Sequence, residues 1–258
     1  IRRQRQMCIR DSNGEIYNHK TRRRQLGEQG HQFRTQCDTE VIVHEWEEHG
    51  PNCVDWLDGQ FGFAVWDQSA QTLMLARDRL GIKPLYYHWN GSRLVCCSEI
   101  KGVLASNLVT AEVDLHSLYY YMGYEFVPAP ATMFQGIQKL PAGHRLLIRN
   151  GELDVQRYWD VQFAPEDLSE EECVRTIRQL LGEAVEQRLM SDVPLGVFLS
   201  GGLDSTAVLA YAREATTRPL PSSTIGYADE TFSEWEHARR AAQHYGTEHH
   251  EILIEPIT

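Results

Sequence analysis

The sequence predicts a chain of two domains, the first of α+β class around an antiparallel sheet and the second of α/β class around a parallel sheet. Two observations carry this prediction. Asn-Gly pairs at 90–91 and 150–151 stand between apolar segments of the first half, and such pairs accept the positive φ angles of a tight antiparallel hairpin. In the second half, short apolar segments alternate with helical patterns. That alternation is typical of a parallel sheet with helices packed across it.

The first half is expected to consist mainly of strands. Phe61, Phe63 and Val65 occupy alternate positions, which predicts a strand with one buried face. The two Asn-Gly turns join 84–89 to 93–98 and 144–148 to 152–158. Convincing helical patterns occur only at 39–49, ended by Gly50, and at 99–105.

A polar linker at 163–168 precedes a long helix in the second half. Ser169 and Glu172 form a capping-box pattern, in which each side chain accepts a hydrogen bond from the other residue's backbone amide. Apolar residues then recur every three or four positions, so one face of this helix is expected to be buried. That face comprises Val174, Ile177, Leu180, Leu181, Ala184, Val185 and Leu189. Strands are predicted at 193–199, 222–227 and 250–254, and helices at 205–214 and 233–245, the last stopped by Gly246.

The composition excludes several classes of protein. Of the residues, 42% are hydrophobic and 24% charged, and no apolar run approaches the roughly 20 residues that cross a bilayer, so no membrane association is expected. The net charge of -11 argues against nucleic acid as a partner, because phosphates require a basic surface. The six cysteines, at 8, 37, 53, 96, 97 and 173, form no metal-type pairs and are expected to be reduced thiols of a cytoplasmic protein.

The first eleven residues are interpreted as an artefact. The run RRQRQMCIRD at 2–11 matches the conceptual translation of a common sequencing adaptor, and such a segment is set aside before the fold is considered. Its arginines therefore say nothing about nucleic acid. The rest of the chain is expected to hold a first domain at 12–163 that is truncated at its N-terminal side and a second domain at 164–258 that is truncated at its C-terminal side.

A glycine-rich turn, 200–205, lies between a predicted strand and a predicted helix. The free amides and the positive dipole end of that helix favour an anion there. Gly201 and Gly202 let the backbone approach a pyrophosphate, and the hydroxyls of Ser200 and Ser205 can donate to its oxygens. No Gly-Lys-Ser/Thr follows, so this is not a Walker loop. The Gly196–Ser200 spacing also differs from that of a hydrolase nucleophile elbow.

The run DVPLGVFLSGGLDS at 192–205 resembles the pyrophosphate loop of the glutamine-hydrolysing asparagine synthetases, within the wider group of ATP pyrophosphatases. The resemblance extends over 13–254. In the first half it rests on NGEIYN at 13–18, LDGQF at 57–61, RDRLGIKPLYY at 77–87 and KLPAGH at 139–144. It implies part of an N-terminal-nucleophile glutaminase domain, followed by part of a parallel-sheet ATP pyrophosphatase domain.

For the first domain, the resemblance implies glutamine hydrolysis by an N-terminal cysteine. Asn13, through its side chain, and Gly14, through its backbone amide, match the family's oxyanion donors. Glu15 and Asp38, together with Asn13, match the positions that hold glutamine, although Asp38 could instead serve as the N-cap of the following helix. The nucleophilic cysteine should precede Asn13 by several tens of residues. Cys8 lacks the free α-amino group that such a thiol uses as base, so the chain as written is expected to be inactive toward glutamine.

For the second domain, the resemblance implies that ATP adenylates the β-carboxylate of aspartate and that ammonia then displaces AMP to give asparagine. ATP or pyrophosphate is expected at Leu199, Ser200, Gly201, Gly202, Asp204, Ser205 and Ile225. Asp204 is expected to position Mg2+, and core packing is an equal alternative for Leu199 and Ile225. The implied partners are glutamine, aspartate and ATP, with a homodimer in the whole protein.

Three alternatives remain open at this point. A β-lactam-forming or other amide-forming relative would share both domains and differ in the acceptor. A GMP synthetase shares the pyrophosphate loop, but its glutaminase has another fold and would not supply the NGEIYN run. The third is a nucleotide-binding module without catalysis.

Overall fold

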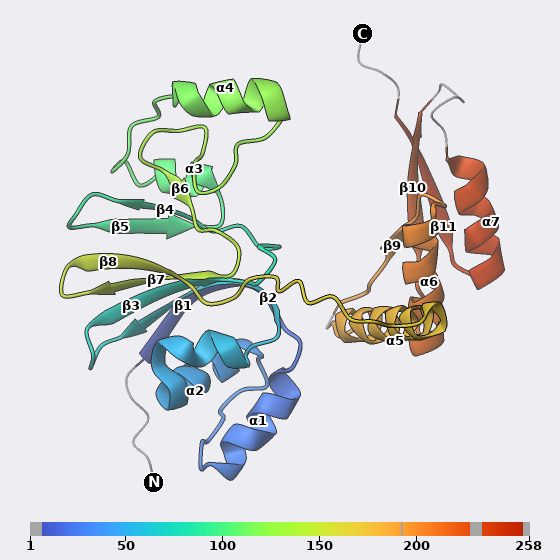
Figure 1. Cartoon of the computed structure of the whole chain (residues 1–258), viewed down its shortest axis with the longest axis horizontal. Helices are drawn as coiled ribbons and strands as arrows, with labels where there is room; N and C mark the ends of the chain where they lie inside the picture. Colours follow the sequence, from blue (N-terminus) through green and yellow to red (C-terminus); the bar gives the residue numbers. More distant parts are fainter. Residues whose placement is uncertain (1–6, 192, 228–233, 255–258) are drawn as a thin grey trace. The chain divides into compact units, whose positions relative to one another are not determined.

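The protein is described from a computed structural model that covers residues 7–191, 193–227 and 234–254. The chain divides into two compact units, residues 1–163 and 164–258. Each unit is described by itself (Figure 1). The antiparallel first half and the parallel second half that the sequence predicts are both present.

The first unit contains two antiparallel sheets. The larger sheet has the order β1-β2-β3-β7-β8 and the smaller one the order β5-β4-β6. The strands of the larger sheet are β1 (Met7–Ile16), β2 (Gly59–Asp67), β3 (Thr72–Arg77), β7 (His144–Arg149) and β8 (Glu152–Arg157). Those of the smaller sheet are β4 (Tyr86–Trp89), β5 (Leu94–Cys97) and β6 (Gln138–Lys139). Both predicted Asn-Gly hairpins are confirmed, since β4 pairs with β5 and β7 with β8 on either side of these turns.

Helices flank the two sheets (Figure 1). On the side of the larger sheet lie α1 (His19–Glu28), α2 (Thr39–His49) and the 3-10 helix η1 (Gly50–Trp56), and beside the smaller sheet lie α3 (Ile100–Leu104) and α4 (Leu115–Tyr124). The expectation of only two helices in this half is therefore wrong. In α1 the only buried residues are Arg22 and Leu26, and in α4 only Ser117. Helix α1 contains one large apolar residue, Leu26, so periodicity gives no signal there. Helix α4 has apolar residues at helical spacing that the prediction missed, and in the structure they are exposed: Leu115, Leu118, Tyr119 and Met122.

Two apolar clusters hold the first unit together. One packs α1, α2 and η1 against β1–β3 and includes Leu26, Ile42, Trp46, Phe61 and Phe63. The other fills the space between the sheets, with Leu75, Leu85, Tyr87, Leu140 and Leu146. Phe61, Phe63 and Val65 are all buried, which confirms the alternation predicted for this strand.

Asp67 is a buried carboxylate at the end of β2, and it makes the stability of the first unit depend on pH. Burial alone would raise its pKa. Hydrogen bonds from Trp46 Nε1 at 3.0 Å and from Ser69 and Ala70 reverse this effect and lower the pKa of Asp67 to about 2. A carboxylate whose pKa is depressed on folding stabilises the fold above the unfolded pKa of 3.8, and this contribution disappears as the pH falls through the folded pKa.

Acidification from pH 4 to pH 2 is therefore expected to remove about 2 kcal/mol of stability through Asp67. Urea unfolding followed by tryptophan fluorescence between pH 2 and pH 6 measures this loss. The Asp67→Asn variant should be less stable at pH 6 and should lack that part of the pH dependence. An equally steep loss in Asp67→Asn would assign the acid sensitivity to other groups.

The second unit is a three-stranded parallel sheet with the order β11-β10-β9. Its elements are α5 (Glu170–Arg188), β9 (Val197–Phe198), α6 (Leu203–Ala215), β10 (Ser222–Tyr227), α7 (Trp235–Tyr245) and β11 (His249–Ile254). The Ser169–Glu172 capping box is present. A core with members in α5, α6 and α7 and at the end of β9 includes Val185, Leu199, Leu209 and Ala242.

Several predicted boundaries in this unit are corrected. The strand expected at 193–199 contains only Val197–Phe198, which pair with Ser222 and Ser223 of β10. The last hydrogen bond of this pairing runs from the Leu199 N–H to the Ser223 carbonyl, at 2.8 Å. The helix expected from Ser205 begins at Leu203. Ser233 lies outside the described residues.

The buried face predicted for α5 is confirmed only near its C-terminus. Val185 is buried, whereas Val174, Ile177 and Leu180 are 43, 63 and 58% exposed. The last turns of α5 pack on α6, with Gly182 lying close to the ring of Tyr211, and no described residue covers the earlier turns to a comparable degree. In the part of the chain that is described, no helix combines the length and the apolar character that spanning a membrane requires.

Candidate functional site

The first candidate site lies where β1 runs beside β2. Asn13 pairs with Gly62 and Gly14 with Phe61 in an antiparallel register. Because side chains alternate along a strand, Asn13 and Glu15 lie on one face and Ile16 enters the core on the other. Both Asn13 and Glu15 are exposed.

Gly14 has a conformation that suits only glycine. Its φ is +145°, and a Cβ atom there would lie 1.9 Å from the carbonyl oxygen of Gln60. The backbones of β1 and β2 therefore approach each other at this point more closely than any side chain permits. The absence of a side chain at Gly14 allows β1 to stay paired with β2 between Asn13 and Glu15. This agrees with the prediction that Gly14 acts through its backbone amide.

Asp38 joins this group from a distant part of the sequence. Its Oδ2 accepts a hydrogen bond of 2.8 Å from the backbone N–H of Ile16. The N-cap alternative is wrong, because Asp38 itself has helical angles, φ -62° and ψ -35°, and makes no side-chain cap to α2. The structure thus brings the predicted residues Asn13, Gly14, Glu15 and Asp38 together around the end of β1.

A small pocket adjoins Asn13. Its walls are Gly62, Phe63 and Ala64 of β2, Pro84 and Leu85, and Cys96, Cys97 and Ser98. Sequence reasoning did not assign these walls, although Pro84 and Leu85 belong to the RDRLGIKPLYY run. Only the pairing of β1 with β2, together with the packing of the smaller sheet, reveals that they border Asn13.

The loop before Pro84 is organised by two buried charged residues. The carboxylate of Asp78 accepts hydrogen bonds from the backbone amides of Phe61, Leu80, Ile82 and Lys83, at 2.9 to 3.2 Å. The guanidinium of Arg77 donates to the carbonyl oxygens of Gly81, Lys83 and Leu140 at 2.6 to 2.7 Å. These contacts fix the course of residues 78–83 and so position one wall of the pocket.

The second candidate site is the turn between β9 and α6. The Oγ atoms of Ser200 and Ser205 lie 3.0 Å apart, and the Ser200 Oγ also accepts a hydrogen bond of 3.3 Å from the Gly202 N–H. Gly202 is the N-cap of α6, so the first amides of that helix converge on the turn. Both hydroxyls and these amides are donors for an anion.

The two glycines of this turn have different roles. Gly201 has φ +80°, and a Cβ atom there would lie 2.4 Å from the backbone nitrogen of Ala238. It allows the turn to pack against α7. Gly202 has an ordinary φ of -70°, and a Cβ atom there would meet only the Ser200 Oγ, at 3.3 Å. The space beside Gly202 is therefore open. Because a phosphate group could occupy this space, the turn is compatible with pyrophosphate.

The remaining predicted residues near the turn differ in their exposure. Leu199 is 1% exposed and belongs to the core, so only its backbone is available to a nucleotide. Ile225 in β10 is 48% exposed. Asp204 is exposed in the first turn of α6. Among the described residues, Asp204 belongs to no group of three metal-type ligands.

Comparison with known proteins agrees with this two-part description. Residues 2–159 match the glutamine amidotransferase domain family, and residues 176–257 match the asparagine synthase family. A chain with these two domains belongs to the class of glutamine amidotransferases. The glutamine amidotransferase match falls in the antiparallel first unit, and the asparagine synthase match falls in the parallel second unit.

The particular family follows from the relatives. The chain is 38% identical to asparagine synthetase (glutamine-hydrolysing) 3 of Bacillus subtilis, over 94% of the chain and 42% of that protein. It is 34% identical to asparagine synthetase 1 of the same organism, over 95% of the chain and 38% of the relative. It is also 34% identical to amidase chry2 of Gibberella zeae, over 94% of the chain and 38% of the amidase. The chain belongs to the glutamine-hydrolysing asparagine synthetase family, and it spans about two fifths of the length of these relatives.

Proposed function

We propose that the whole protein makes asparagine from aspartate, with ammonia taken from glutamine and with ATP as the source of energy. The observation that carries this proposal is that one chain contains two features. The first is the group of Asn13, Gly14, Glu15 and Asp38 at the end of β1, and the second is an open glycine turn beside a parallel sheet. The amidotransferase domain is assigned to residues 12–163 and the synthetase domain to residues 164–258. Reduced cysteines and soluble substrates suit a cytoplasmic location.

In the glutaminase reaction, the Asn13 side-chain amide and the Gly14 backbone amide would donate to the oxyanion of the tetrahedral intermediate. Donors of this kind are worth about 3 to 4 kcal/mol each in the transition state. Glu15 and Asp38 would hold the glutamine. The carboxylate of Asp38 is held beside β1 by its hydrogen bond to Ile16, so it needs no rearrangement to face a ligand that lies next to Glu15.

In the synthetase reaction, the turn at 200–205 would hold the pyrophosphate part of ATP. Ser200, Ser205 and the first amides of α6 supply the donors. Asp204 would position Mg2+, a hard cation that prefers carboxylate and phosphate oxygens. The acceptor carboxylate would be activated as a β-aspartyl-adenylate.

The original chain is expected to bind pyrophosphate weakly and in a Mg2+-dependent way, and Gly202→Val should reduce this affinity at least tenfold, or by about 1.4 kcal/mol. The valine side chain enters the open space at Gly202 without contacting the backbone, so the fold should persist. Titration calorimetry with Mg2+ and pyrophosphate measures the effect. Equal binding by both chains would place the anion elsewhere.

A control variant separates binding from folding. Gly201→Ala should destabilise the second unit, because the added methyl group meets the backbone of α7. Its unfolding midpoint should fall, whereas that of Gly202→Val should stay close to the original. If Gly202→Val also unfolds, its loss of binding says nothing about the phosphate.

A second acceptor is favoured by the similarity to amidase chry2. The same two domains would then form an amide on a different carboxylate. The whole protein, supplied with glutamine, ATP and aspartate, distinguishes the two functions. Asparagine formed in proportion to pyrophosphate supports the first, and no asparagine with aspartate but pyrophosphate release with another carboxylic acid supports the second.

A further inference from the structure

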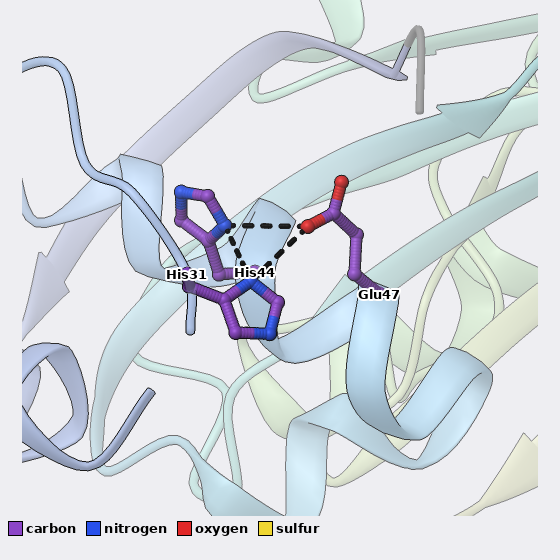
Figure 2. Close-up of side chains that lie close together, drawn as sticks. All are labelled: His31, His44 and Glu47. Atoms are coloured by element: carbon purple, nitrogen blue, oxygen red, sulfur yellow. Dashed lines mark hydrogen bonds and ion pairs between the residues drawn. The ribbon is translucent and has the colours of Figure 1, made fainter. Parts of the chain in front are cut away.

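A group of buried imidazole and carboxylate side chains lies in the first unit, apart from both sites described above. His31, His44 and Glu47 point toward one another (Figure 2). The side chains of His31 and His44 are 3% and 1% exposed, and that of Glu47 is 12% exposed. Two histidines buried this completely beside acidic groups require a specific explanation, because each buried ring nitrogen needs a partner.

The local structure explains how these side chains meet. His44 and Glu47 are three residues apart on α2 and therefore share one face. His31 follows the C-terminus of α1, where Gly30 has φ +98° and the amides of Gly30 and His31 donate to the carbonyls of Gly27 and Leu26. This is a Schellman ending, and it turns the chain so that His31 lies over α2.

Three possible ligand atoms form a nearly equilateral triangle. His31 Nδ1 lies 3.0 Å from His44 Nδ1, and Glu47 Oε2 lies 3.2 Å from the first and 3.3 Å from the second. Ligands about 2.0 to 2.1 Å from a tetrahedral zinc ion are about 3.3 Å apart. The triangle thus has the size of one face of a tetrahedral site, and a water molecule would complete the coordination.

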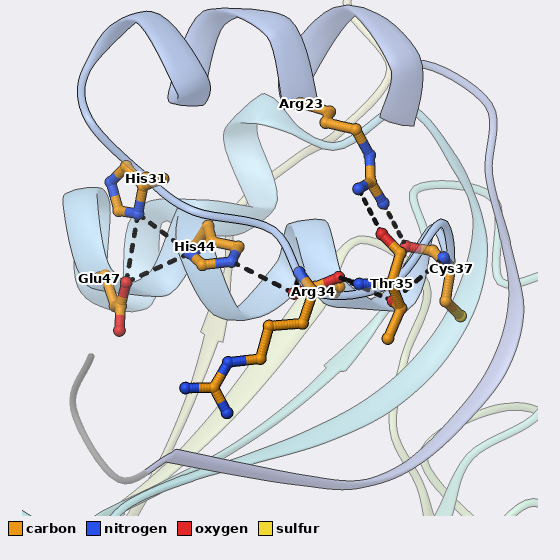
Figure 3. A network of polar contacts seen from close by, with 8 residues as sticks. Arg23, His31, Arg34, Thr35, Cys37, His44 and Glu47 are labelled. Atoms are coloured by element: carbon orange, nitrogen blue, oxygen red, sulfur yellow. Dashed lines mark hydrogen bonds and ion pairs between the residues drawn. The ribbon is translucent and has the colours of Figure 1, made fainter.

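One outer nitrogen has a carboxylate partner. His31 Nε2 lies 2.8 Å from Glu48 Oε1, so a proton on this nitrogen leaves the Nδ1 lone pair of His31 directed at His44 Nδ1 and Glu47 Oε2 (Figure 3). His44 Nε2 has no hydrogen-bond partner, since Glu40 Oε1 lies 3.7 Å away. With both Nδ1 atoms unprotonated, a cation between them and Glu47 Oε2 would offset the repulsion of their lone pairs. Metal-binding histidines commonly donate their other N–H to a carboxylate, as His31 would to Glu48.

Glu40 fixes the segment beside this group. Its carboxylate accepts hydrogen bonds from the backbone amides of Arg34 and Thr35, at 2.7 and 2.8 Å, and from the Thr35 hydroxyl at 2.7 Å. The ring of Phe33 lies 4.3 Å from that of His44 and covers it from one side. The same segment, 31–37, is thus attached to α2 at two places and leads directly to Asp38.

We propose that His31, His44 and Glu47 bind a divalent transition metal ion of the zinc class. Imidazole nitrogen with one carboxylate is a donor set that such ions prefer. The ion would hold segment 31–37 against α2. Its role would be structural, since none of the three ligands is among the residues Asn13, Gly14, Glu15 and Asp38.

The test uses the complete 258-residue chain, stripped of metal with a chelator and titrated with Co2+ and with Zn2+. One equivalent of Co2+ should bind and give visible d–d bands that Zn2+ abolishes. Glu47→Gln and His31→Gln should each weaken binding at least about tenfold, the lower limit seen even for outer-shell partners. His116→Ala, at an exposed histidine on α4, should bind like the original chain.

Thermal unfolding provides a second measurement. Zn2+ should raise the melting temperature of the original chain and of His116→Ala, because an ion that binds only the folded state stabilises it, and should not raise that of Glu47→Gln. Glu47 is partly exposed and its replacement keeps the side-chain volume, so this variant is expected to fold. Absence of a Co2+ spectrum, or equal Zn2+ stabilisation of Glu47→Gln and the original chain, would overturn the proposal.

Discussion

Replacing Asp78 by alanine is expected to destabilise the first unit by roughly 4 kcal/mol or more. The carboxylate is 1% exposed and accepts hydrogen bonds from four backbone amides. Each buried donor left without an acceptor costs about 1 to 3 kcal/mol, and water can reach only part of this loop. Urea unfolding, followed by the fluorescence of the tryptophans in the first unit, measures the loss.

Two further variants sharpen this experiment. In Asp78→Asn one oxygen becomes an amide group that cannot accept, so two of the four hydrogen bonds are lost and about half of the effect is expected. Asp154→Ala removes an exposed carboxylate on β8 and should change stability by less than about 0.5 kcal/mol. If Asp78→Ala were as stable as Asp154→Ala, water would have replaced the carboxylate.

The consequence of Asp78 for the site is indirect. The loop that it organises leads to Pro84 and Leu85, which line the pocket beside Asn13. A conformational change of residues 78–83 would therefore alter the wall of the pocket without touching any residue that is proposed to contact glutamine.

The features that sequence predicted well are local ones. The hairpins at 90–91 and 150–151, the capping box at Ser169 and the helix at 39–49 each depend on residues within a few positions of one another. The family resemblance likewise rests on continuous runs. Such features need no knowledge of which strands pair.

The features that sequence could not predict depend on distant contacts. Asp38 has a pattern that suits an N-cap, but its carboxylate instead bonds to Ile16, 22 positions earlier. His31 meets His44 only because α1 ends at Gly30 in a left-handed turn. Helix α1 contains one large apolar residue, Leu26, and so periodicity does not detect it.

The glycines show the same limit. Sequence assigned Gly201 and Gly202 one shared role, the close approach of a phosphate. The structure separates them, because only Gly202 faces open space and Gly201 packs on α7. Similarly, sequence predicted a backbone role for Gly14, but not that the neighbouring strand makes this position intolerant of any side chain.

Gly14→Ala is expected to destabilise the first unit by at least about 3 kcal/mol. An alanine at φ +145° is strained by about 1 to 3 kcal/mol, and its methyl group would lie 1.9 Å from the Gln60 oxygen, which forces β1 away from β2 at a further overpacking cost of about 1 to 3 kcal/mol. The displacement falls between Asn13 and Glu15, so glutamine binding in the whole protein should be lost as well.

A matched substitution tests whether the contact or the backbone angle is responsible. Gly151 also has a positive φ, +80°, but a Cβ atom there meets nothing within 4 Å. Gly151→Ala should therefore show only the conformational cost of about 1 kcal/mol, and the difference between the two variants measures the close approach of β1 to β2. Because the contact involves only the first unit, unfolding monitored at Trp235 in the second unit should be unchanged in Gly14→Ala. Equal destabilisation by the two substitutions would mean that β1 yields readily at Gly14, and the rigid donor geometry proposed for Asn13 and Gly14 would then be wrong.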